Sequence, residues 1–280
     1  MIIDFHTHTF PDELAPRVIP RLEKFSKTTA FNGGTIAELQ KAMFDSNVDF
    51  SVNQPVATHA NQVITCNDFA ISINSKYDNL ISFGTMHPDF PDYDNELTRI
   101  KNLGIKGIKL HPNYQETYFD DIKYKRIVYK ANELDLIVLT HAGIDIGLPE
   151  PVYATPQIIK NLISDVHPEK LVLAHMGGCF MWDEVIETLA GENVYLDTAF
   201  AIDYINYTES IPQEERIYSM LSEEILLKMV EIFSPDKILF ATDNPWCSQK
   251  DVISYLQKLT LSDVDKAKVL GENAKILLNI

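Results

Sequence analysis

The stretch Leu136-Ile-Val-Leu-Thr-His141-Ala-Gly143 joins a short apolar run to a histidine, and four other stretches of the chain follow the same plan. Each ends in residues that can bind a metal or move a proton: Ile2-Ile-Asp-Phe-His6-Thr-His8, Gly107-Ile-Lys109-Leu-His111-Pro112, Leu171-Val-Leu-Ala-His175 and Ile238-Leu-Phe-Ala-Thr-Asp243. Short continuous apolar runs are typical of buried strands in a parallel sheet. Because neighbouring parallel strands end at one edge of the sheet, we expect these polar residues to converge, as they do in enzymes.

Eight such runs alternate with segments whose apolar residues recur every three or four positions. The runs begin near Ile2, Val48, Leu80, Gly107, Leu136, Leu171, Val194 and Lys237. The helical segments include residues 36–45, 95–103, 123–134, 156–166, 183–189 and 223–233, and residues 261–280 are predicted to form a closing helix. Strand followed by helix, repeated eight times, predicts an α/β fold of the (β/α)8 TIM-barrel type, with residues 1–280 as one domain.

Local signals agree with this assignment. Thr35 followed by Glu38 is a capping box, which favours a helix start, and Gly104 stands where the helix before it needs a left-handed residue to end. Two connections are longer than a tight loop requires: residues 9–34, with a helical stretch around 14–25, and residues 200–221. Both follow strand carboxyl ends, the first and the seventh, so they are predicted to be lid-like insertions over the functional face.

Composition excludes several partners. The net charge of −16 opposes an extended surface for nucleic acid or for an anionic membrane. No apolar run approaches the roughly 20 residues that cross a bilayer. The three cysteines form no Cys-x-x-Cys pair and are too few for a disulfide framework, and residues 1–6 enter a strand with no signal segment ahead of them. We therefore expect a cytoplasmic protein with a small-molecule substrate, with a homodimer left open.

Strand geometry predicts how the polar ends are placed. Side chains alternate along a strand, so His6 and His8 leave the same face, with Asp4 expected one layer below them. By the same rule His141, His175 and Asp243 stand above apolar inward layers. Those layers are predicted to be Ile137 with Leu139, Leu171 with Leu173, and Leu239 with Ala241. Two imidazoles on one strand can both reach one cation, and imidazole suits zinc, iron, nickel or manganese.

These motifs, together with Thr140-His-Ala-Gly143, Ala174-His-Met-Gly-Gly178, Ala241-Thr-Asp-Asn-Pro-Trp246 and the tail Val269-Leu-Gly-Glu-Asn-Ala-Lys-Ile-Leu278, resemble the amidohydrolase superfamily. More narrowly, the chain is similar to its amidohydrolase 2 branch, which holds metal-dependent hydrolases and relatives of aminocarboxymuconate-semialdehyde decarboxylase. The resemblance runs from Asp4 to Leu278. It implies that His6, His8, His141 and Asp243 bind one divalent metal, with zinc first and manganese, iron or nickel as alternatives.

The resemblance also gives His175 a role on substrate or water and not on the metal. Some branches carry a bridging carboxylate or a carboxylated lysine on the fourth strand, where this chain has Lys109 and His111. That departure favours a single metal.

The predicted mechanism uses these groups to activate water. A cation held by three imidazoles and one carboxylate lowers the pKa of a water molecule bound to it. Asp243 would take the proton, and His175 would hydrogen-bond the attacked carbonyl and stabilise its developing charge. Lys109 or His111 could share that role or hold a substrate carboxylate. Asn53, His87, Trp246 and Arg216 are further candidate substrate contacts, because they end strands or lie in rim loops.

Three reactions fit this set. The first is hydrolysis of a small ester, lactone or amide. The second is non-oxidative decarboxylation of a small aromatic or unsaturated acid, in which His175 or Asp243 delivers a proton to carbon and a cationic anchor such as Arg17, Arg21 or Arg216 points at the metal. The third is phosphoester hydrolysis, although sites of that kind usually use several metals and further carboxylates. A barrel that keeps its metal without catalysis is the non-enzymatic alternative.

Overall fold

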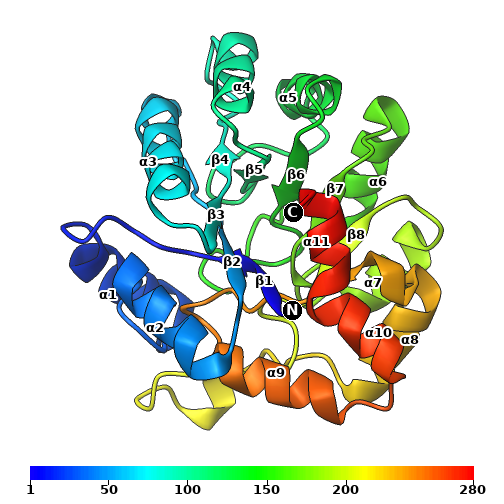
Figure 1. The fold of residues 1–280 in the computed structure, drawn as a ribbon. Coiled ribbons are helices and arrows are strands. Elements are labelled where there is room, and N and C mark those ends of the chain that lie inside the picture. Colours follow the sequence, from blue (N-terminus) through cyan, green and yellow to red (C-terminus); the bar gives the residue numbers. More distant parts are fainter.

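The computed structural model describes all 280 residues as a barrel of parallel strands surrounded by helices (Figure 1). The strands are β1 (Ile3–Thr7), β2 (Phe50–Asn53), β3 (Leu80–Ser82), β4 (Gly84–Thr85), β5 (Gly107–Leu110), β6 (Ile137–Thr140), β7 (Leu171–Leu173), β8 (Tyr195–Asp197) and β9 (Ile238–Leu239). All their pairings are parallel, in the orders β1-β2-β3 and β4-β5-β6-β7-β8-β9. The predicted eight-stranded pattern is therefore present, with the third strand interrupted.

Backbone contacts close the two sheets into one barrel. Phe83 separates β3 from β4 along the chain, and its N–H still donates to the carbonyl of Asn53 on β2. At the other seam the Phe5 N–H donates to the Phe240 carbonyl, and the Asp243 N–H donates to the His6 carbonyl. The first and last strands thus lie side by side, which brings His6 and Asp243 together although they lie far apart in the sequence.

Helices surround the barrel, and the last of them covers one end of it. They are α1 (Ala15–Ser26), α2 (Ile36–Ser46), α3 (Val63–Lys76), α4 (Tyr93–Asn102), α5 (Ile122–Glu133), α6 (Pro156–Val166), α7 (Trp182–Leu189), α8 (Glu223–Phe233), α9 (Gln249–Lys258), α10 (Asp263–Ala267) and α11 (Asn273–Leu278). The predicted helical segments match these bounds within about three residues. The predicted closing helix consists of three consecutive segments in the structure: α10, a π-helical turn over Lys268–Glu272, and α11. None of the helices is both long and apolar enough to cross a bilayer.

The apolar interior divides into two clusters. The larger packs the helices onto the outside of the barrel. The smaller fills the barrel itself with residues such as Phe5, Phe83 and Leu139, and Leu277 of α11 packs against it. Figure 1 shows α11 beside the amino terminus of the chain, where it covers the end of the barrel at which the strands begin. The amino-terminal end is therefore sealed by apolar packing, which leaves the carboxyl ends of the strands for chemistry.

Two local predictions are confirmed. Thr35 accepts a hydrogen bond from the Glu38 N–H while the Glu38 carboxylate accepts one from the Thr35 N–H, so the capping box is complete. Gly104 follows α4 with a φ of +88°, in the left-handed region that glycine adopts most easily.

Two predictions of strand orientation are wrong. Asp4 does not lie beneath His6, because its carboxylate bonds Thr242 and Gln249 outside the barrel. The pairing of β1 with β2 shifts between Asp4 and Thr7, and this irregularity turns His6 inward although Phe5 also faces the interior.

The second error concerns β7. The inward residues are Val172 of β7 and Ala174, which directly follows it, whereas Leu171 and Leu173 face the helices. His175 follows Ala174 directly and has a φ of +59°. A left-handed turn, and not strand alternation, therefore places the His175 side chain over the barrel.

The two long connections lie against one another. An antiparallel bridge joins Thr28 of the first to Tyr207 of the second, and the Thr29 N–H donates to the Asn206 carbonyl. A salt bridge of 2.7 Å between Lys27 and Glu215 adds to this contact. Both segments thus form one joined arm, and whether it acts as a lid stays a prediction.

Candidate metal centre

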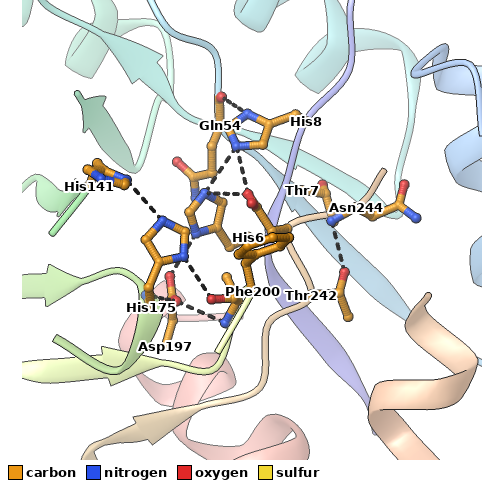
Figure 2. A network of polar contacts seen from close by, with 12 residues as sticks. His6, Thr7, His8, Gln54, His141, His175, Asp197, Phe200, Thr242 and Asn244 are labelled. Carbon is orange, nitrogen blue, oxygen red and sulfur yellow. Dashed lines mark hydrogen bonds and ion pairs between the residues drawn. The ribbon is translucent and has the colours of Figure 1, made fainter. Parts of the chain in front are cut away.

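Three predicted ligands converge at the carboxyl end of the barrel. The Nε2 atoms of His6 and His8 lie 3.1 Å apart, and Asp243 Oδ1 lies 3.4 Å from the first and 3.0 Å from the second. Figure 2 shows the two histidines of the first strand turned toward one another. A tetrahedral ion with bonds of about 2.1 Å holds its ligand atoms about 3.4 Å apart. The three donors are therefore spaced for one small cation.

Their hydrogen bonds fix which ring nitrogen carries the proton. His8 Nδ1 lies 2.7 Å from the Gln54 carbonyl, which can only accept, and His6 Nδ1 lies 2.8 Å from the Asp197 carboxylate. Each neutral ring then holds its proton on Nδ1 and has a lone pair on Nε2. Two lone pairs facing each other at 3.1 Å repel unless a positive charge lies between them. This donor set fits the divalent metal that the sequence predicts.

Lys109 supplies a positive charge at the same place. Its ammonium lies 3.0 Å from His6 Nε2, and the side chain is buried inside the barrel. Burial lowers the pKa of Lys109 to about 8, against the opposing effect of Asp197, Asp243 and Asp145. Lys109 therefore lies within the site, and its predicted role toward the attacked carbonyl or a substrate carboxylate stays a prediction.

Asp197 orients His6, and the sequence analysis did not include it. Besides His6 Nδ1, its carboxylate accepts the backbone N–H groups of His175 and Ala199 at 2.9 and 3.1 Å. Burial raises the pKa of Asp197, whereas the charge of Lys109 and these hydrogen bonds lower it and favour the carboxylate. Asp197 is the last residue of β8 and follows an apolar run. The pattern that predicted the other site residues, a polar residue at the end of an apolar strand, therefore also applies to Asp197.

Asp243 reaches the group through a left-handed turn, with a φ of +62°. Such a conformation is unfavourable for a residue with a side chain and clusters at functional sites. Burial raises the pKa of Asp243, but the contact with His8 and the charge of nearby groups such as Lys109 lower it below its usual value. Asp243 is therefore a carboxylate, suited to bind a metal or accept a proton.

His141 and His175 form a second pair beside this group. His175 Nδ1 lies 2.7 Å from the Ala199 carbonyl, so the neutral ring has its lone pair on Nε2. That atom lies 3.0 Å from His141 Nδ1, which must donate to it (Figure 2). Burial lowers the pKa of His175 to about 4. Neutral His175 can therefore accept a proton at Nε2. Its predicted role as a hydrogen-bond donor to the attacked carbonyl would require His175 to carry a proton on Nε2 as well as on Nδ1.

The structure places His141 in a different group from the other predicted ligands. One donor atom each from His141, His111 and Asp145 lies within 4.8 Å of the others, just as His6, His8 and Asp243 form a separate set. The rings of His111 and His141 stack with centroids 4.3 Å apart. Coordination of the first metal by His141 stays a prediction, and Asp145 is a further residue that no sequence signal indicated.

The side chains of the other predicted substrate contacts form no hydrogen bond or ion pair with these donors. Asn53 uses its amide within the fold, accepting from Thr9 and donating to Ser82. The Arg216 guanidinium donates to the Ile211 carbonyl and lies over the Tyr207 ring, within the joined arm. His87 accepts the Asp89 N–H, and Trp246 is half-buried against the helix-facing core. Of these four residues, Trp246 contacts a metal-donor residue through its backbone, since its N–H donates to the Asp243 carbonyl at 2.8 Å.

Comparisons with known proteins agree with this fold. Three similar solved structures are 5-carboxyvanillate decarboxylase LigW from Sphingomonas paucimobilis, a dihydroxybenzoic acid decarboxylase from Polaromonas with bound manganese and 2-nitroresorcinol, and a putative amidohydrolase from Staphylococcus aureus. Their TM-scores are 0.71, 0.71 and 0.70, and their sequence identities are 15%, 16% and 16%. They cover 100%, 99% and 100% of this chain, and it covers 99%, 96% and 99% of theirs. A search of curated proteins finds no match.

The family model described as Amidohydrolase, Amidohydro_2, matches residues 3–280. That range includes every strand of the barrel and every residue of both donor groups. The predicted resemblance is confirmed: the chain belongs to the amidohydrolase 2 family.

Proposed function

We propose that this protein is a metal-dependent, non-oxidative decarboxylase of a small aromatic carboxylic acid. The sequence analysis placed hydrolysis first and decarboxylation second. The comparisons support the reverse order, because several of the similar structures are decarboxylases of substituted benzoic acids and match over nearly their whole length. Two similar structures hold bound manganese, which supports manganese, already an alternative in the sequence prediction, beside zinc as the metal.

The observation that carries the proposal is the buried ammonium of Lys109 beside His6 and within the influence of three carboxylates. A carboxylic acid substrate brings a negative charge into a dry site, where an unpaired anion is strongly unfavourable. No arginine contacts His6, His8 or Asp243, and by the expectation from the sequence an arginine-free site counts against a decarboxylase unless another cation serves as the anchor. Lys109 takes its place as the positive charge within the barrel.

The reaction needs one proton and no oxidant. The bond between the ring carbon and the carboxylate breaks, carbon dioxide leaves, and the electron pair left on carbon forms a C–H bond. The metal, held by His6, His8 and Asp243, would supply positive charge next to the substrate oxygens. The Lys109 ammonium, which the nearby carboxylates of Asp197, Asp243 and Asp145 keep charged, is the candidate proton donor. Asp243 is ionised and His175 is neutral, so these two act as acceptors.

Hydrolysis of a small ester, lactone or amide is the second candidate. It is favoured by the same acceptors, because the Asp243 carboxylate and the His175 Nε2 lone pair are the groups that remove a proton from water. Lys109 would then stabilise the negative charge that develops on the carbonyl oxygen.

A direct activity comparison separates the two. Protein loaded with manganese or zinc is incubated with a panel of hydroxybenzoates and nitrogen-containing aromatic acids, and carbon dioxide and the decarboxylated product are measured. A parallel panel contains esters, lactones, amides and a phosphate monoester. We expect turnover of at least one acid, lost in Lys109→Met and unchanged in His167→Asn, because His167 ends α6 at the amino-terminal end of the barrel strands. Turnover confined to the second panel contradicts the proposal.

A further inference from the structure

A cavity of about 220 Å³ lies at the end of the barrel where the strands begin, opposite the metal centre. Lys106 directly precedes β5, Ile137 is the first residue of β6 and Lys170 directly precedes β7, and all three line the cavity. The end of α11 forms another wall, and Figure 1 shows it next to β6. Pockets for drug-sized ligands measure about 300–1,000 Å³. This cavity therefore suits a smaller molecule, and no residue of the metal centre lines it.

Three lysines, Lys101, Lys106 and Lys170, give this space an excess of positive charge, and we call it the basic cavity. Asp135 is the one acidic residue among those that line it, and its carboxylate pairs with the Lys170 ammonium. Lys101 and Lys106 instead donate to backbone carbonyls, which carry no net charge. The acceptors are the carbonyl of Asp135 at 3.0 Å and that of Leu278 at 2.8 Å. Two positive charges are therefore left without a carboxylate partner, in a chain whose net charge is −16.

The ammonium groups keep donors for a ligand. An ammonium has three N–H donors, and each of these lysines uses one of them on the partner named above. Each side chain is only half-buried, so its ammonium lies between the cavity and solvent. Charged N–H donors form shorter and stronger hydrogen bonds with a carboxylate than neutral groups form with each other. The three lysines are therefore placed to bind an anion.

The inner wall of the basic cavity is apolar. Ile105, Ile137, Leu277 and Leu278 form it, and all four are at most 7% exposed. Inorganic phosphate would lose hydration against these side chains without gaining a hydrogen bond from them. A molecule with an apolar body would instead remove apolar surface from water on both sides of the contact. The wall therefore favours an organic anion over an inorganic one.

We infer that the basic cavity is a binding site for a small carboxylate with an apolar body, such as a one-ring aromatic acid. The carboxylate binds Lys101 and Lys106, and the apolar body packs against Ile137 and Leu277. A sugar phosphate fits less well, because its hydroxyl groups would face the apolar wall without partners. The site is separate from the metal centre, so the inference does not depend on which reaction the protein catalyses.

Methyl NMR spectra locate the ligand. Zn²⁺-loaded protein that carries ¹³C-labelled isoleucine δ1 methyl groups is titrated with benzoate. We expect the signals of Ile105 and Ile137, assigned with Ile105→Val and Ile137→Val, to shift and reach a plateau. Both residues line the basic cavity, so their signals report binding there even when benzoate also binds at the metal centre. Inorganic phosphate at the same concentrations should not produce these shifts.

Lysine variants test the source of the affinity. In Lys101→Met combined with Lys106→Met, the dissociation constant of benzoate should rise roughly tenfold or more, because charge-assisted hydrogen bonds are lost. Lys237→Met is the matched control, since Lys237 also directly precedes a strand, β9, but donates to Asn193 outside the cavity. It should bind benzoate as the unmodified protein does. If the double variant fails to fold, which circular dichroism detects, Lys101→Met alone gives the answer.

Three results overturn the inference. Signals of Ile105 and Ile137 that stay fixed up to the solubility limit of benzoate show that no carboxylate binds in the cavity. An equal dissociation constant in the lysine variant and the unmodified protein shows that these lysines do not hold the carboxylate. Tighter binding of inorganic phosphate than of benzoate shows that the apolar wall does not select the ligand.

Discussion

Replacing Asp197 with asparagine tests how the first donor group is prepared for a metal. The Asp197 carboxylate accepts the Nδ1 proton of His6 through one oxygen and two backbone N–H groups through the other. Asparagine keeps an oxygen for the backbone donors but presents an NH₂ group to His6. Two donors cannot face each other, so the His6 ring must move its proton to Nε2. The nitrogen that faces His8 and Asp243 then donates, and it loses the lone pair that a metal needs.

The size of the effect follows from that one hydrogen bond. Partners that orient a metal-binding histidine typically change metal affinity 10- to 100-fold when they are mutated. This range equals about 1.4–2.7 kcal/mol. A hydrogen bond to a charged group contributes about 1.5–3 kcal/mol, so the two estimates agree. We expect Asp197→Asn to weaken metal binding at least tenfold without preventing folding.

Competition against a metal-sensitive dye measures the dissociation constant directly. The matched control is Glu96→Gln, because Glu96 is also a buried carboxylate, 4% exposed, but pairs with Asn67 and Arg99 on the outside of the barrel. It should destabilise the fold and leave metal affinity unchanged. Equal metal affinity in Asp197→Asn and the unmodified protein would refute the assignment of the His6 tautomer.

Three further predictions concern stability. Burial raises the pKa of Asp4 to about 6 from 3.8, so between these pH values the folded protein keeps a proton that the unfolded chain loses. In metal-free protein, protonated Asp4 therefore contributes about 3 kcal/mol to the free energy of unfolding. This contribution is fully present below pH 4 and is lost as the pH rises through 6. Urea unfolding at pH 4, 5 and 7 should show that dependence in the unmodified protein relative to Asp4→Asn, and parallel curves would contradict it. Thr35→Ala removes a complete capping box and should lower the free energy of unfolding by about 1 kcal/mol, and a loss below 0.3 kcal/mol (roughly the measurement error) would show that the cap contributes nothing. Removing bound metal should lower the melting temperature, because an ion at about 100 times its dissociation constant stabilises by about 2.7 kcal/mol; an unchanged melting temperature would mean that the folded state does not bind the metal preferentially.

Much of the fold is readable from the sequence because buried parallel strands leave a strong pattern. Continuous apolar runs located every barrel strand, and the capping box at Thr35 located a helix start. The interruption at Phe83 was not predicted, because its apolar side chain continues the run while the pairing changes from one sheet to the other.

The site was readable only in part. Polar residues at strand ends correctly brought His6, His8 and Asp243 together, since the barrel closes between the first and last strands. Alternation failed at Asp4 and at His175, where a shift in pairing and a left-handed turn decide which way a side chain points. Sequence patterns carry little information about either event.

Asp145 marks the limit of such reasoning. It lies in a loop, and its position depends on the close contact of Gly143 with Cys179 on a neighbouring connection. Contacts between loops depend on the finished fold and leave no periodic signal in the sequence. The grouping of His141 with His111 and Asp145 could therefore come only from the structure.

The central claim is that His6, His8 and Asp243 together hold a divalent metal. Crystals of the protein grown with Mn²⁺ or Zn²⁺ and measured at the absorption edge of that metal would test it most directly. The account predicts an anomalous peak within bonding distance of His6 Nε2, His8 Nε2 and Asp243 Oδ1, with Lys109 Nζ displaced from its contact with His6. An anomalous map with no peak among these three atoms, while Lys109 stays against His6, would contradict it.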